Sequence, residues 1–271
     1  MIFSLSKGFI FFGLPKSGST SLHFLLSGYG ELVFTRIENG KHETCQNLIN
    51  SGHAFFEKHP YQEYLKFGVI REPTSLVRSW YRVWSNPMLE NPKHPAHNRW
   101  LNGKSIDEFV DILEAEQLFE GPDSFYRMDD GSLGVDYLIR LDRMKDDVLS
   151  LEAILPIDIA DKIETTHFNP SYKGPTKSSG SELDAATKSR IESVFARDME
   201  LYESVDRLNK EFLESGWRAP PTNNALATFK QLYPELYSMS ENDKRYNAIK
   251  RMVPEPLLSW IQVMKKNLSE I

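Results

Sequence analysis

The chain has 271 residues, of which 40% are hydrophobic and 26% are charged, and its formal net charge is -6. These values are typical of a soluble globular protein with one α/β domain and an extension. A net acidic chain disfavours general attraction to nucleic acid or to an anionic membrane, so we expect neither as a partner. No apolar run reaches the ~18 residues of a membrane-spanning helix. A single cysteine, Cys45, excludes an internal disulfide, which favours a cytoplasmic protein, and we expect Cys45 to be a small buried residue.

Apolar runs and amphipathic segments alternate through the first half of the chain. This alternation predicts strands at 8–14, 31–36 and 66–71, and helices at 19–28, 41–52 and 75–85. Strands that alternate with helices are typical of a parallel sheet with helices on both faces. The sequence therefore predicts a three-layer α/β fold with a central parallel sheet.

The second half begins with a loop rich in Pro, Asn and His at 86–104. Ser105 and Glu108 then have the spacing of a capping box at the start of a helix. The remaining predicted elements are this helix at 105–117, a fourth strand at 135–141, a helix at 143–155 and a long helix, whole or broken, at 183–215. We assign residues 1–215 to one domain and residues 216–271 to a helical extension packed on it.

A loop that is suited to phosphate follows the first predicted strand. Gly13 and Gly18 have the spacing of the nucleotide-binding loop G-x-x-x-x-G-K-[ST]. Ser19 stands where that loop has its lysine, and Lys16 lies two residues before the second glycine instead. The backbone N–H groups and the helix N-terminus can still hold a phosphate. No predicted strand ends in the aspartate of a metal-dependent NTPase, so we expect no metal.

A second phosphate-binding pattern follows the third predicted strand. Arg71 ends that strand at its carboxyl edge, where ligands of open α/β sheets bind. Pro73 then turns the chain into a helix, and Ser79 lies about two turns along it. A guanidinium and a hydroxyl in this arrangement can grip one dianionic phosphate.

Together the two motifs resemble those of sulfotransferases that use 3′-phosphoadenylyl sulfate (PAPS). Residues 15–21, PKSGSTS, resemble the P-K-x-G-[ST]-[TS] loop of that family, in the form of its bacterial and carbohydrate-type branch. Residues Arg71, Pro73, Ser79 and Tyr81 fill the family's 3′-phosphate motif. Weaker likenesses at 139–147, 166–169 and 196–202 extend the resemblance over about residues 8–205.

The resemblance implies a sulfotransferase-like nucleotide-binding fold and transfer of a sulfuryl group from PAPS. The acceptor would be a hydroxyl or an amine or amide nitrogen of a small molecule or glycan, and 3′-phosphoadenosine 5′-phosphate (PAP) would be the product. Lys16 would stabilise the leaving phosphate, and Arg71 and Ser79 would bind the 3′-phosphate. The 5′-phosphate would be held by Lys16 and by the loop and first turn of the helix: Ser17, Gly18, Ser19, Thr20 and Ser21.

The acceptor's proton requires a general base. His42 follows the second predicted strand, and an ordinary histidine pKa near 6.5 suits the task. Glu43 is the neighbouring alternative, and His94 and His97 of the long loop could also reach the acceptor. Lys173, in a Gly, Ser and Lys-rich loop, could approach the nucleotide.

Two other functions remain open at this stage. One is a nucleotide kinase or NTPase with an altered phosphate loop, and the other is a nucleotide-binding module without catalysis. The oligomeric state is not predicted.

Overall fold

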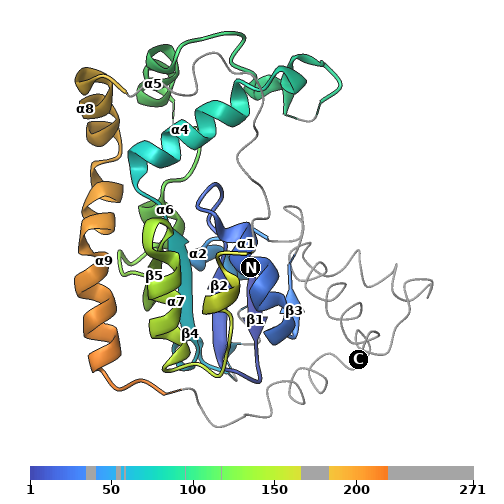
Figure 1. Cartoon of the computed structure of the whole chain (residues 1–271), viewed down its shortest axis with the longest axis vertical. Coiled ribbons are helices and arrows are strands. Elements are labelled where there is room, and N and C mark those ends of the chain that lie inside the picture. The colour runs from blue at the N-terminus through green and yellow to red at the C-terminus, as the bar shows by residue number, and fades with distance from the viewer. Residues whose placement is uncertain are drawn as a thin grey trace, which may run out of the picture.

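The structure is a computed structural model that describes residues 1–34, 41–52, 56–57, 59–94, 96–116, 118–165 and 183–218. Within these residues one five-stranded sheet has the order β3-β1-β2-β4-β5 and helices on both faces (Figure 1). The strands are β1 (Ile2–Ser4), β2 (Phe9–Phe12), β3 (Leu32–Val33), β4 (Leu65–Ile70) and β5 (Tyr137–Arg140). The predicted α/β class is therefore confirmed. Lys173 and most of the predicted extension at 216–271 lie outside the described residues.

The sheet is mixed, so the prediction of a wholly parallel sheet is wrong. β2, β4 and β5 are parallel neighbours, but β1 runs antiparallel to both β2 and β3. The reason is local, because the apolar N-terminal run divides into two strands that form a hairpin. Gly8 has a φ of 70°, which is readily accessible only without a Cβ, and it helps the chain to reverse before β2.

Most of the predicted helices are present with shifted ends. The helices are α1 (Ser19–Leu26), α2 (Cys45–Ser51), α4 (Pro73–Trp84), α5 (Ile106–Ala115), α6 (Pro122–Tyr126), α7 (Met144–Glu152), α8 (Ala185–Val194) and α9 (Ala196–Glu214). Short 3₁₀ turns lie at Ser27–Tyr29, Tyr61–Glu63, Pro87–Glu90, His97–Arg99, Leu141–Arg143 and Ala160–Lys162. The capping box of α5 is confirmed, and the long C-terminal helix is broken at Phe195. The one-and-a-half-turn α6 was not predicted.

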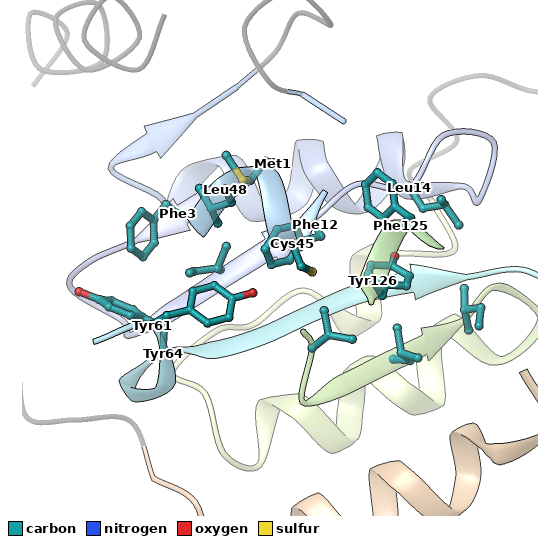
Figure 2. Packing of buried hydrophobic residues seen from close by; sticks show 14 of the residues in the cluster. Met1, Phe3, Phe12, Leu14, Cys45, Leu48, Tyr61, Tyr64, Phe125 and Tyr126 are labelled. Carbon is teal, nitrogen blue, oxygen red and sulfur yellow. The ribbon is translucent and has the colours of Figure 1, made fainter. Parts of the chain in front are cut away.

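Alternating residues of β2 divide the interior into two apolar layers, as the pleat of a strand requires. Ile10 and Phe12 pack on one face with α2, α6 and α9, and Figure 2 shows this cluster. Phe9 and Phe11 pack on the other face with α1 and α7. Cys45 lies within the first cluster, where burial raises the pKa of its thiol to about 12, so its expected role as a buried residue is confirmed.

A third apolar cluster joins α4, α5 and α8 beyond the carboxyl ends of β4 and β5 (Figure 1). Trp84 of α4 packs edge-on against Phe109 of α5, with ring centroids 5.4 Å apart. This packing fixes α4 above the edge of the sheet where the predicted phosphate-binding residues lie. No helix in the described part of the chain is both long and apolar enough to cross a membrane.

Candidate anion-binding site

The loop between β2 and α1 is closed by its own hydroxyl groups. Ser17 Oγ and Ser19 Oγ each donate to the carbonyl oxygen of Leu14 over 2.8 Å, and both side chains are buried. Their hydroxyls therefore hold the loop in shape. Any contact of these two residues with a ligand would therefore come from their backbone N–H groups.

Two residues of this loop adopt the left-handed region of backbone conformation. Gly18 has a φ of 83°, and a Cβ placed on it would lie 2.5 Å from Leu141 Cδ1. Lys16 has a φ of 63°, which is strained for a residue with a side chain and costs about 1–3 kcal/mol. Such strain concentrates where a backbone must present its groups to a ligand.

The start of α1 differs from the starts of four other helices. The side chains of Thr44, Glu72, Ser105 and Asp184 accept backbone hydrogen bonds at the starts of α2, α4, α5 and α8. The start of α1 has no such side chain, and its first turn contains no acidic residue. Helix N-termini carry unpaired N–H groups and a partial positive charge, so this end of α1 can accept an anion.

Arg71 connects the two predicted phosphate motifs. Its Nη1 donates to the carbonyl oxygen of Lys16 over 3.0 Å, and its Nε donates to Ser75 Oγ over 2.9 Å. Burial lowers the pKa of Lys16, and the charges of Arg71 and Arg82 lower it further. Burial likewise lowers the pKa of Arg71, with Arg82 as the next cause, although Glu72 partly offsets the effect. The site is therefore electropositive before any ligand binds.

Arg140 provides a comparison on the neighbouring strand, where it pairs in register with Ile70. The Arg140 guanidinium lies 3.0 Å from the Asp142 carboxylate and 3.7 Å from that of Asp206, and it stacks on the Tyr202 ring. Arg71 makes no ion pair with any residue that the structure describes, and neither does Lys16. Of two arginines at the ends of adjacent strands, one has carboxylate partners and the other has none within the described residues.

The remaining predicted phosphate ligands lie on α1 and α4. Thr20 and Ser79 are half-buried, and neither side-chain hydroxyl makes a hydrogen bond within the described residues. Ser21, also half-buried, lies in the first turn of α1. The serine that contacts Arg71 is Ser75, one turn before Ser79, and the sequence did not predict this contact.

His42 lies against Gly13, at the start of the loop between β2 and α1. The strand that precedes His42 in the sequence, β3, is not a neighbour of β2, because β1 lies between them. His42 Nδ1 donates to the carbonyl oxygen of Gly13, which leaves Nε2 as the acceptor of a neutral ring. Burial lowers the pKa of His42 to about 4, so the ring is neutral at physiological pH and is a weaker base than an ordinary histidine.

The alternative bases are arranged differently. Burial and the nearby charge of Glu43 raise the pKa of Glu120, so these two carboxyl groups lie near each other. His94 accepts from the Ala96 backbone over 3.1 Å, and His97 donates to the Leu89 carbonyl over 2.6 Å, so both support the structure of their own loop. The described part of the chain contains no group of three or more His, Cys, Asp or Glu arranged to hold a metal ion.

Sequence reasoning missed Arg82, which affects the pKa of both Lys16 and Arg71. Its helical spacing from Ser75 and Ser79 is the signal that could have found it. Comparisons of the chain with family models, with curated proteins and with solved structures found no match.

Proposed function

We propose that this protein is a sulfotransferase that transfers a sulfuryl group from PAPS to a hydroxyl or nitrogen of a small molecule or glycan. The observation that carries the proposal is the hydrogen bond from Arg71 to the Lys16 carbonyl. It joins two motifs, 55 residues apart, that each match a phosphate-binding segment of that family. It also puts two cations without ion-pair partners in the described residues beside the uncapped start of α1. A donor with separate 3′ and 5′ anionic groups is the ligand that this arrangement favours.

The reaction breaks the bond between sulfur and the oxygen that bridges it to the 5′-phosphate, and forms a bond from sulfur to the acceptor atom. Negative charge develops on the bridging oxygen, which leaves with PAP. The Lys16 ammonium and the N–H groups at the start of α1 are the groups suited to stabilise that charge. The acceptor's proton passes to His42 Nε2, whose lone pair is oriented because Nδ1 donates to Gly13. Neither step requires a metal.

The proposal is tested first by nucleotide binding. Calorimetry should show that PAP binds far more tightly than AMP or ATP, because Arg71 and Ser79 supply the 3′-phosphate position. Arg71→Gln should weaken PAP binding by about 2–4 kcal/mol, as expected for the loss of one partner of a buried charge pair. Arg140→Gln is the matched control, since Arg140 ends the adjacent strand but is already paired. Equal affinity for PAP and AMP would contradict the assignment of the 3′-phosphate site.

Turnover distinguishes the proposal from its two alternatives. The purified protein should transfer sulfate from PAPS to at least one member of an acceptor pool, with full activity in the presence of a metal chelator. Activity that requires ATP and Mg²⁺ would identify a kinase or NTPase instead. Tight PAP binding without transfer to any acceptor would identify a nucleotide-binding module.

A further inference from the structure

The face of α4 that contains Ser75 points toward the phosphate loop. Arg71, whose Nη1 reaches the Lys16 carbonyl, also donates from Nε to Ser75 Oγ. At 3.6 residues per turn, Arg82 lies within about 20° of Ser75 around the helix axis, and Ser79 lies within about 40°. The buried residues Val77 and Trp84 lie about 160–180° from Ser75, on the opposite side of the helix. Arg82 therefore projects from the same face as the two serines.

The charge of Arg82 is unbalanced within the described part of the protein. Its half-buried side chain makes no ion pair there, although ion pairs are frequent elsewhere on the molecule. The charge of Arg82 helps to lower the pKa of both Lys16 and Arg71, which indicates that Arg82 lies near these two residues. Lys16, Arg71 and Arg82 therefore repel one another around one loop, and none of them forms an ion pair within the described residues. An anion bound between them would relieve this repulsion.

We propose that Arg82 is a further ligand-binding residue of this site and contacts the donor nucleotide together with Lys16 and Arg71. The identity of the ligand as PAPS or PAP rests on the proposed function, whereas the role of Arg82 as an anion ligand does not. A guanidinium close to both Lys16 and Arg71 can donate to the 5′-phosphate or to the 3′-phosphate of the nucleotide. The site would then present three cations, in addition to the N–H groups of α1, to a ligand with two anionic groups.

The stability of the ligand-free protein distinguishes a purely structural role of Arg82 from a role in ligand binding. Arg82 lies in the last turn of α4, where a cation stabilises the helix dipole, and on that basis Arg82→Gln would lower the melting temperature of the ligand-free protein. If Arg82 instead contributes to an unpaired cation cluster, its removal relieves repulsion. Arg82→Gln should then raise the melting temperature of the ligand-free protein and reduce the increase produced by ligand.

The experiment measures binding and melting temperature with two probes, PAP and inorganic pyrophosphate, which lacks adenosine. Arg82→Gln should weaken both probes about ten- to a hundred-fold, and Arg82→Lys should recover most of the loss because the charge is kept. Arg207→Gln is the control, since it removes one positive charge from an exposed pair with Glu211 on α9 and should leave both affinities unchanged.

The outcomes separate this inference from the proposed function. If the wild-type protein binds pyrophosphate but not PAP, and Arg82→Gln loses pyrophosphate, the proposed function fails and the role of Arg82 stands. If PAP binds equally well to the wild type and to Arg82→Gln, the role of Arg82 is refuted and the proposed function stands. If the wild-type protein binds neither probe, both are refuted.

Discussion

Substitution of Gly18 by alanine tests the structure of the phosphate loop. Gly18 has a φ of 83°, and a residue with a Cβ loses about 1–2 kcal/mol in the left-handed region. The new Cβ would also lie 2.5 Å from Leu141 Cδ1, so the leucine must move, which adds about 1 kcal/mol because the contact is the end of a side chain. We expect Gly18→Ala to lower the free energy of unfolding by about 2–3 kcal/mol and to weaken PAP binding.

Gly131→Ala is the matched control for this substitution. Gly131 also has a φ of 83°, but a Cβ added there would meet nothing within 4 Å. Gly131→Ala should therefore cost about 1–2 kcal/mol, the backbone contribution alone, and leave PAP affinity unchanged. Urea denaturation gives the two free energies, and calorimetry gives the affinities. The reasoning would be refuted if the two variants lost the same stability and both bound PAP like the wild type.

Three further predictions concern Lys16, His42 and Asp198. Lys16→Ala and Lys16→Gly should both lower kcat about 10²–10³-fold, because both lose the ammonium, but the glycine variant should be more stable to urea since it removes the strain of a φ of 63°. His42→Ala should lower kcat about 10²-fold, and the wild-type pH–rate profile should show no acidic limb near 6.5, because burial lowers the His42 pKa to about 4; a limb near 6.5 that His42→Ala abolishes would contradict this. Burial raises the pKa of Asp198 to about 6, so the stability gained from its proton is complete below pH 4 and is lost as the pH rises through 6. Asp198→Asn keeps an oxygen acceptor for the Asp123 N–H and should be more stable than the wild type at pH 8 but not at pH 4. Denaturation series at both pH values measure the difference in unfolding free energy between the two proteins, and the same difference at both would refute the reasoning.

Local sequence patterns were sufficient to predict the elements that form the site. The apolar runs before Gly13 and Arg71 identified β2 and β4, since both strands are buried on both faces and contain continuous apolar segments. The spacing of Gly13 and Gly18 identified the loop, because the motif is contained within a few consecutive residues and needs no information about distant ones. The capping box of α5 was predicted for the same reason.

The path of the N-terminal run and the contacts of His42 depended on tertiary structure. The same apolar residues could form one strand or two, and the pairing of β1 with both β2 and β3 decides between them. The low pKa of His42 follows from its burial, which outweighs the opposite effect of the hydrogen bond to Gly13, 29 residues earlier in the chain. A sequence pattern contains no measure of that burial, so the ordinary pKa was the natural expectation.

The two arginines at the ends of β4 and β5 show most clearly where the sequence stops being informative. Arg71 and Arg140 both lie where an apolar strand ends, and in the sequence only the residues that follow Arg71 singled it out as a phosphate ligand. Arg140 forms an ion pair with Asp142, two residues later in the chain. Helix α9, about 60 residues later, adds Tyr202 and Asp206 beside the same guanidinium. Arg71 meets the Lys16 carbonyl and Ser75, and no carboxylate within the described residues forms an ion pair with it. The sequence thus determined which residues lie at this edge of the sheet, while tertiary packing decided which of their charges have ion-pair partners within the described residues.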